Sequence, residues 1–128
     1  MTNDLEANKA TVLAYYDLAF NQRKPEEAVA KYLGPTYRQH NPMAADGAEP
    51  FIGFVKWITG EYPELKVTFK RVIAEGDMVV VHCHIQKSPA DLGQAVADFF
   101  RLENGKVVEH WDVIQEIPEK AENNNTMF

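Results

Sequence analysis

The last third of the chain has the pattern of a single β-hairpin that carries titratable groups on both arms. The segment runs from Asp98 to Gln115, and Asn104-Gly105 marks its turn. Large β-branched and aromatic side chains alternate with charged or titratable ones along each arm. In an ordinary half-buried hairpin the polar residues face water. The hairpin therefore poses the question of which polar residues face inward, since a buried Asp or His needs a partner.

The register of the hairpin decides the answer, and two turns are compatible with the sequence. A two-residue Asn104-Gly105 turn pairs Leu102 with Val107 and puts Asp98 opposite Trp111. A three-residue loop with a bulge pairs Leu102 with Lys106 and puts Asp98 opposite His110. We favour the three-residue loop. It places on one face Asp98, Phe100, Val108, His110, Asp112 and Ile114, and on the other Phe99, Arg101, Val107, Glu109, Trp111, Val113 and Gln115.

Length and charge narrow the class of protein. The 128 residues predict one domain, 1–128, with a single core. A net charge of −6 without a Lys/Arg cluster argues against nucleic acid and against an anionic membrane surface as partners. No apolar run approaches the roughly 18 residues of a membrane span. Because the N-terminus lacks the pattern of a secretion signal and Cys83 is the only cysteine, we expect a cytoplasmic protein.

Helical spacing comes first along the chain and strand spacing follows. A helix is expected from Asn3, which forms a capping-box variant with Glu6, to about Phe20, and a second from Pro25 to Gly34-Pro35. A short strand over 36–40 and a helix from Pro50 to Gly60 follow. The period then changes to two, which predicts strands over 67–73, 78–85, 95–102 and 106–116. This order predicts an α+β fold with a mostly antiparallel sheet. The polar tail, 118–128, is expected to be flexible or to dock through Met127-Phe128.

Several of these features together resemble a known family. A tyrosine-bearing first helix, a short strand that ends in His40-Asn41-Pro42 and the segment from Gly105 to Asp112 (Gly-Lys-Val-Val-Glu-His-Trp-Asp) are similar to the SnoaL-like polyketide cyclases, within the nuclear transport factor 2 and ketosteroid isomerase superfamily. The resemblance covers nearly the whole chain. It implies a cone: a curved, mostly antiparallel sheet wrapped over N-terminal helices (cystatin-like, or nuclear transport factor 2-like) with a deep apolar pocket. It also implies dimers through the convex face of the sheet.

The resemblance also implies roles for individual residues. The general acid/base aspartate of the cyclases corresponds to Asp112. The proton-donating aspartic acid and the oxyanion tyrosine of ketosteroid isomerase correspond to Asp98 and Tyr16. The catalytic base of that isomerase corresponds to Asn41, and an asparagine cannot abstract a proton, so the isomerase mechanism itself is excluded. Pocket-lining positions of the isomerase correspond to His82 and His84.

A pocket of this composition predicts proton transfer next to a carbonyl group. A carboxylate in a dry pocket has a raised pKa, which suits a general acid or base near neutral pH. A neighbouring histidine can relay the proton, and a tyrosine or asparagine can donate to a developing enolate oxygen. The expected catalytic residues are Asp112, His110 and Asp98. The expected ligand-binding residues are Tyr16, His40, Asn41, His82, His84, Phe100 and Ile114.

Each of these residues also has a purely structural interpretation. Asp112 can simply pair with His110 or Arg38, and Tyr15 competes with Tyr16 if the first helix is rotated. His82 and His84 share a strand face and, with His110 and Asp112, could form a facial metal set. Since such histidines more often hydrogen-bond within the core, we expect neither a metal nor another cofactor. Cys83 alternates away from both histidines and is expected to be buried and inert.

Three functions are compatible with this pattern. The first is a small cofactor-independent enzyme, an isomerase or lyase, that performs aldol cyclisation or keto–enol isomerisation on a small apolar carbonyl compound. The second is a non-catalytic ligand-binding or accessory protein on the same fold. The third is an epoxide hydrolase, which needs an arginine between two inward carboxylates. Phe99, Trp111, Val107 and Val113 form an apolar outer face in the favoured register, which predicts a two-fold homodimer.

Overall fold

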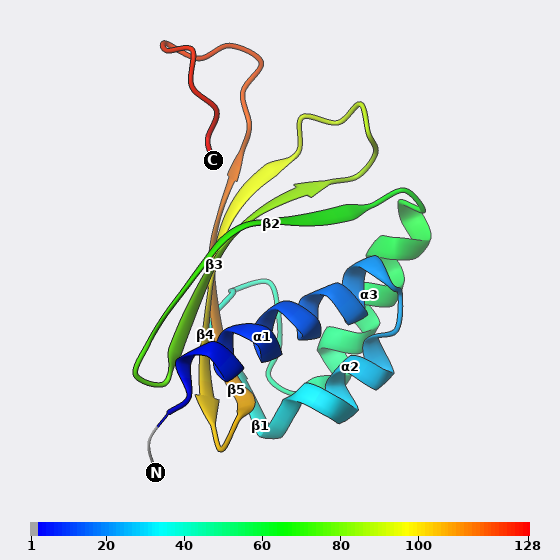
Figure 1. The fold of residues 1–128 in the computed structure, drawn as a ribbon. Coiled ribbons are helices and arrows are strands. Elements are labelled where there is room, and N and C mark those ends of the chain that lie inside the picture. The colour runs from blue at the N-terminus through cyan, green and yellow to red at the C-terminus, as the bar shows by residue number, and fades with distance from the viewer. Residues whose placement is uncertain (1–2) are drawn as a thin grey trace.

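Three α-helices and a five-stranded sheet form the fold in the computed structural model, which describes residues 3–128, and the first strand lies between the second and third helices. The helices are α1 (Leu5–Tyr16), α2 (Pro25–Tyr32) and α3 (Ala48–Glu61). The strands are β1 (Leu33–Gln39), β2 (Lys66–Glu75), β3 (Met78–Gln86), β4 (Gln94–Glu103) and β5 (Lys106–Glu116). The sheet order is β1-β5-β4-β3-β2, with β1 parallel to β5 and the other pairs antiparallel. The helices lie on one side of a strongly curved sheet (Figure 1). The predicted α+β fold is confirmed.

Local signals account for the helix boundaries. The Asp4 carboxylate accepts a hydrogen bond from the backbone N–H of Ala7 at 3.0 Å, so the N-cap is Asp4 and not Asn3 as expected from the sequence. Pro25 opens α2, which ends where Leu33 turns to extended backbone. Helix α3 begins before Pro50, at Ala48, after Gly47 with a φ of 101°. None of the described helices is both long and apolar enough to cross a membrane.

The end of α1 widens into a π-helical turn, η1 (Asp17–Asn21). This turn buries Leu18, Ala19 and Phe20 in succession. The amide of Asn21 both donates to the carbonyl oxygen and accepts from the N–H of Val67, each at 2.9 Å, which ties the turn to the start of β2. The turn thereby holds Tyr16 and Phe20 over the concave face of the sheet.

The hairpin of β4 and β5 differs from the register that we favoured. The turn is the two-residue Asn104-Gly105 turn, with φ values of 52° and 77°, and Leu102 pairs with Val107. A bulge at Val108 then shifts the register by one residue, so Arg101 pairs with Glu109 and Asp98 lies opposite Asp112. The bulge returns His110, Asp112 and Ile114 to the face predicted for them. Val107 was predicted to face outward, but it is fully buried in the core beside Leu102.

An aromatic cluster fills the space between α1, α3 and the sheet. The fully buried ring of Phe100 makes edge contacts with Tyr15 and Tyr16, with ring centroids 6.2 and 5.1 Å apart. Phe51 of α3 lies 5.1 Å from Tyr15 and 6.3 Å from Tyr16. The two tyrosines that competed in the sequence are therefore both buried. The Tyr16 hydroxyl reaches the polar cluster described below, whereas the Tyr15 hydroxyl has no hydrogen-bond partner among the described residues.

The C-terminal tail turns back onto the outer face of the sheet (Figure 1). The Phe128 ring lies 5.1 Å from the ring of His82 and 4.8 Å from that of His84, and the Lys70 ammonium lies 5.2 Å from its centroid. Both histidines therefore face away from the helices, on the side of the sheet that the tail touches.

Candidate functional site

A cavity of about 170 Å³ opens between the helices and the concave face of the sheet. Aromatic rings form its apolar walls, with Tyr16 and Phe20 on one side and Phe51 and Phe54 of α3 on the other. Residues lining its polar end are Gln39, Asn41, His110 and Asp112. The described residues that line it include no lysine or arginine. The cavity therefore offers apolar walls and hydrogen-bonding groups, but no cationic side chain among the described residues.

A second, smaller cavity of about 110 Å³ continues along the same helix–sheet gap. It shares five lining residues with the first: Tyr16, Phe20, Asn41, Phe54 and Asp112. Asp98 and Ile114 line only the second. Asp112 consequently lies at the junction of the two cavities, where a ligand in either one can reach its carboxylate.

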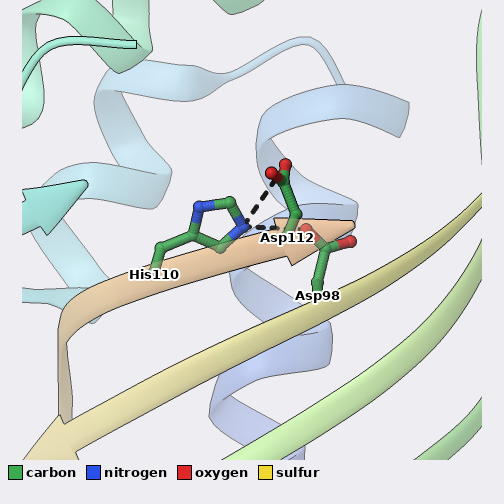
Figure 2. Close-up of side chains that lie close together, drawn as sticks. All are labelled: Asp98, His110 and Asp112. Carbon is green, nitrogen blue, oxygen red and sulfur yellow. Dashed lines mark hydrogen bonds and ion pairs between the residues drawn. The ribbon is translucent and has the colours of Figure 1, made fainter. Parts of the chain in front are cut away.

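Asp98, His110 and Tyr16 form a buried hydrogen-bonded cluster. Figure 2 shows Asp98 and His110 of this cluster together with the neighbouring Asp112. His110 Nε2 lies 2.8 Å from Asp98 Oδ1, and both side chains are almost fully buried. The Tyr16 hydroxyl lies 3.1 Å from His110 Nε2 and 3.3 Å from Asp98 Oδ1. Burial raises the pKa of Tyr16 well above its usual value, and the nearby Asp98 adds to the rise. Tyr16 thus stays protonated and can act as a hydrogen-bond donor.

Cys83 completes the surroundings of Asp98. Its thiol donates to Asp98 Oδ2 at 3.6 Å, and burial raises the pKa of the thiol, with Asp98 adding to the rise. The predicted burial of Cys83 is confirmed, but the residue contacts the site and is not remote from it.

Asp112 is the acid that lines both cavities. Its Oδ2 accepts a hydrogen bond from Asn41 Nδ2 at 3.1 Å and lies 4.0 Å from His110 Nε2. Burial raises the pKa of the Asp112 carboxyl, the Asn41 hydrogen bond and His110 act to lower it, and Asp98 acts to raise it. The net rise moves the carboxyl towards the range in which a general acid or base works near neutral pH.

Sequence reasoning missed Gln39, which contacts His110 from the neighbouring strand. The parallel pairing of β1 with β5 places Gln39 beside His110, and Gln39 Oε1 lies 2.7 Å from His110 Nδ1. The alternation of Tyr37 and Gln39 was a usable signal, since the buried Tyr37 implies that Gln39 faces the same way.

Three of the expected ligand-binding residues, His40, His82 and His84, face the outer side of the sheet and lie away from the two cavities. His82 and His84 face the outer side because Cys83, between them, faces the core, and strand residues alternate. His84 Nε2 contacts the Leu92 carbonyl at 2.8 Å, and His82 contacts Arg71. His40 follows Gln39 and faces outward, 2.6 Å from Glu109 and stacked on Trp111 at 4.7 Å.

The remaining expected site residues lie on the predicted face. Phe100 is fully buried beneath Tyr16 and His110, so it supports the site without lining a cavity. Ile114 lines the second cavity and is partly exposed. Tyr16, Asn41, Asp98, His110 and Asp112 are brought together as described above.

Two further chemistries depend on which groups face the cavities. Asp98, His110 and Asp112 offer one ligand atom each within 4.8 Å of one another, and these are the residues that would hold a divalent cation. Each of them already has a hydrogen-bond partner in the cluster.

Epoxide hydrolysis needs an arginine between the carboxylates. Arg101 instead bonds Glu103 and Glu109 at 2.7 and 2.8 Å on the outer face.

The α+β fold, with its helices on one side of a curved five-stranded sheet, is that of a nuclear transport factor 2-like domain. The SnoaL-like domain family matches residues 12–110. The chain belongs to this family. The match ends two residues before Asp112, so the role of Asp112 depends on the geometry and not on the extent of the match. The family fold encloses a pocket for small molecules.

Solved structures agree with this assignment of the fold. A candidate ketosteroid isomerase from Kribbella flavida is 25% identical, with a TM-score of 0.74 over 96% of this chain and 87% of that chain. TsrD from Streptomyces laurentii is 22% identical, with a TM-score of 0.74 over 88% and 90% of the two chains. A candidate SnoaL-like polyketide cyclase from Jannaschia sp. is 21% identical, with a TM-score of 0.71 over 89% of each. No match was found among curated protein sequences.

Proposed function

We propose that this protein catalyses proton transfer next to the carbonyl group of a small neutral ketone or aldehyde, as in aldol cyclisation or keto–enol isomerisation. The observation that carries the proposal is the position of Asp112. Its carboxylate lies where two apolar cavities meet, burial raises its pKa, and it has only one hydrogen-bond donor, Asn41, within bonding distance among the described residues. Such a carboxylate can remove a proton from a carbon atom adjacent to a carbonyl group.

The buried cluster beside Asp112 supplies the second half of this chemistry. Removal of the proton puts negative charge on the carbonyl oxygen, and donors that are already oriented stabilise that charge without reorganisation. Tyr16 and Asn41 line the same cavity as Asp112 and can donate hydrogen bonds at its polar end. In this proposal Asp112 is the general base, Tyr16 and Asn41 stabilise the enolate oxygen, and His110, which lies 3.1 Å from the Tyr16 hydroxyl, relays a proton. Asp98 holds His110, and the chain uses no cofactor.

The apolar walls and the charge of the site indicate the ligand class. Two carboxylates and no lysine or arginine among the described lining residues disfavour anionic ligands such as carboxylates and phosphates. A volume of about 170 Å³ is below the roughly 300 Å³ at which typical ligand pockets begin. We therefore propose a neutral ligand of one or two rings.

Exchange of carbon-bound protons tests the proposal without knowledge of the natural substrate. Neutral cyclic ketones with one and two rings are incubated with the protein in deuterated water, and loss of the proton signals next to the carbonyl group is followed by NMR. We expect exchange above the buffer rate for at least one ketone, and saturation with ketone concentration. Binding of ketones without any exchange beyond that of the Asp112→Asn variant would instead support a non-catalytic binding protein.

We also propose that the protein forms a two-fold dimer through the outer face of the sheet. Ile73, Val80, Phe99 and Trp111 lie opposite one another across four adjacent strands and form an apolar row. Val113, on the same face of β5, is 68% exposed. A second copy of the chain would cover this row, since monomers rarely leave such a surface in water.

The single, buried and protonated Cys83 is compatible with the proposed cytoplasmic location.

The substitution Val113→Asp is expected to dissociate this dimer. It places two unpaired carboxylates in the same apolar interface, and the dissociation constant should rise by about 10²-fold or more. Light scattering after size-exclusion chromatography over a concentration series measures the effect. Leu92→Asp is the control, because Leu92 is also a partly exposed apolar residue, 48% exposed, but lies in the β3–β4 loop. A wild-type protein that elutes as a monomer at every concentration would contradict the proposal.

A further inference from the structure

One oxygen atom of the Gln39 side chain lies within hydrogen-bond distance of two nitrogen atoms. Its Oε1 lies 2.7 Å from His110 Nδ1 and 3.3 Å from the backbone N–H of Asn41. Gln39 is the last residue of β1, and the parallel register places it opposite His110 of β5. The contact to His110 thus comes from a strand that the hairpin itself does not include.

The backbone contact determines which atom of the amide faces His110. A backbone N–H can only donate, so the atom of Gln39 that it meets is the carbonyl oxygen and not the NH₂ group. The same oxygen faces His110 Nδ1. Nδ1 must therefore carry a hydrogen atom for that contact to be a hydrogen bond.

We propose that Gln39 is a positioning residue that keeps the hydrogen atom of His110 on Nδ1 and directs Nε2 towards Asp98, Tyr16 and the cavity. The side-chain carbonyl of Gln39, at the end of β1, selects the tautomer and the orientation of the His110 ring. Hydrogen-bond partners of catalytic histidines commonly act in this way. The assignment of the tautomer is independent of the proposed function. Its catalytic consequence depends on that function.

The proton count of the cluster follows from this tautomer. With Nδ1–H bonded to Gln39, the 2.8 Å contact between His110 Nε2 and Asp98 Oδ1 is a hydrogen bond only if it contains another proton. The pair therefore holds two protons. It is either an imidazolium with a carboxylate or a neutral imidazole with a carboxylic acid, and it is neutral overall in both forms. Asp112 is then the acid left to gain and lose a proton during turnover, a division of roles between two nearby carboxyl groups.

Titratable groups from several elements surround His110 and its partner Asp98. Tyr16 of α1 is neutral because its pKa is raised by burial. Tyr37 of β1 stacks on the imidazole with centroids 6.4 Å apart, and burial raises its pKa also. The described titratable groups around the Asp98–His110 pair are Tyr16, Tyr37, Cys83 and Asp112. Only Asp112 adds negative charge, and it lies farther from Nε2 than Asp98 does.

The nitrogen chemical shifts of the His110 ring test the proposal directly. NMR of protein labelled with ¹⁵N in histidine resolves four imidazoles, and the signals of His110 are assigned by their loss in His110→Gln. In the wild type we expect Nδ1 to carry hydrogen. In Gln39→Met, which keeps the side-chain length but lacks the acceptor, we expect the neutral ring to move its hydrogen to Nε2, where Asp98 accepts it. Gln39→Glu restores an acceptor and should restore the hydrogen on Nδ1.

The matched control is Gln115→Met, at an exposed position near the end of β5. It should leave the His110 signals unchanged. A wild-type ring without hydrogen on Nδ1, or a Gln39→Met protein with the wild-type pattern, would overturn the proposal. If Gln39→Met does not fold, Gln39→Glu decides alone, since loss of the hydrogen from Nδ1 in that variant contradicts the role of the acceptor.

Ketone exchange separates this proposal from the proposed function. If both hold, Gln39→Met lowers kcat by about 10²-fold, with a smaller change in KM, and alters the pH profile, while Gln39→Glu recovers part of the loss. Exchange that is absent from the wild type, together with the expected ring signals, would remove the function and leave the positioning role of Gln39 intact.

Discussion

The variant Asp112→Asn is expected to lose about 10²- to 10⁴-fold in the rate of ketone proton exchange, which is the usual contribution of a positioned general base. Asparagine has nearly the same shape but cannot take up the proton. The Asn41 amide can still donate to the new side-chain oxygen, so the wall of the cavity is retained. The loss should appear in kcat and not chiefly in KM. An unchanged exchange rate in a folded variant would show that Asp112 is not the base.

The same variant is expected to be more stable than the wild type at neutral pH. The folded-state pKa of Asp112 is raised, chiefly by burial, so the folded protein holds this proton more tightly than the unfolded chain does. The wild type therefore loses stability as pH rises from about 4, the usual pKa of Asp, through the folded-state pKa. Above that window the penalty is complete, and asparagine removes it. Below about pH 4 the penalty is absent, and the advantage of the variant should disappear.

Asp91→Asn is the matched control for this pH dependence. The carboxylate of Asp91, in the β3–β4 loop, accepts backbone hydrogen bonds from Lys87 and Gly93, and these lower its pKa. A lowered pKa has the opposite sign: it stabilises the fold above the unfolded pKa, and the benefit is lost as pH falls through the folded one. Thermal unfolding across a pH series should therefore show Asp112→Asn above the wild type and Asp91→Asn at or below it at neutral pH. A Tm of Asp112→Asn below the wild type at neutral pH would contradict the burial argument.

Phe100→Ala is expected to have the largest effect on stability, about 3–5 kcal/mol. The Phe100 ring is fully buried, and its aromatic neighbours come from two other elements: Tyr15 and Tyr16 of α1, and His110 of β5. Its removal leaves a cavity directly below the buried cluster of Asp98, His110 and Tyr16, where the surrounding backbone is held by strand pairing and cannot collapse easily. Chemical denaturation with a constant slope measures the loss.

Phe99→Ala is the control for Phe100→Ala, because the two residues are adjacent on β4 and differ in the face they occupy. Phe99 is on the outer face and only partly buried in the single chain. Measured at low protein concentration, where any dimer is dissociated, Phe99→Ala should cost clearly less than Phe100→Ala. Equal costs at that concentration would mean that the inward orientation of Phe100 does not carry the stability of this region.

The local pattern of the sequence predicted the fold class and most of the polar side chains that face the helices. Helix spacing followed by strand spacing predicted the α+β order, because 3.6- and 2-residue periods are set by backbone geometry. His110 and Asp112 were placed on one face because residues of a strand separated by two positions share a side. Asp98 was added to that face through the favoured register, and the observed register keeps it there although its partner is Asp112 and not His110. Tyr16 and Asn41 were added by the family resemblance, and their contacts with the acids agree with it.

The wrong expectations concerned which face of a strand a residue occupies and how residues of different strands pair. His82 and His84 were assigned to the pocket by correspondence, although the burial of Cys83 between them required the opposite face. The hairpin register depended on a bulge at Val108 that no local signal marks. Without that bulge, His110 and Asp112 would face away from Asp98.

The chain by itself determined the order of its elements, the two-sided character of its strands and the identity of the acids and the imidazole. These properties follow from backbone periods and side-chain chemistry within a few residues. Only the tertiary structure decided that Asp98 lies opposite Asp112, that Gln39 bonds to His110 and that Asp112 lies where two cavities meet. Those contacts join residues up to 71 positions apart in sequence, and their geometry is set by how the whole sheet twists and packs against α1 and α3.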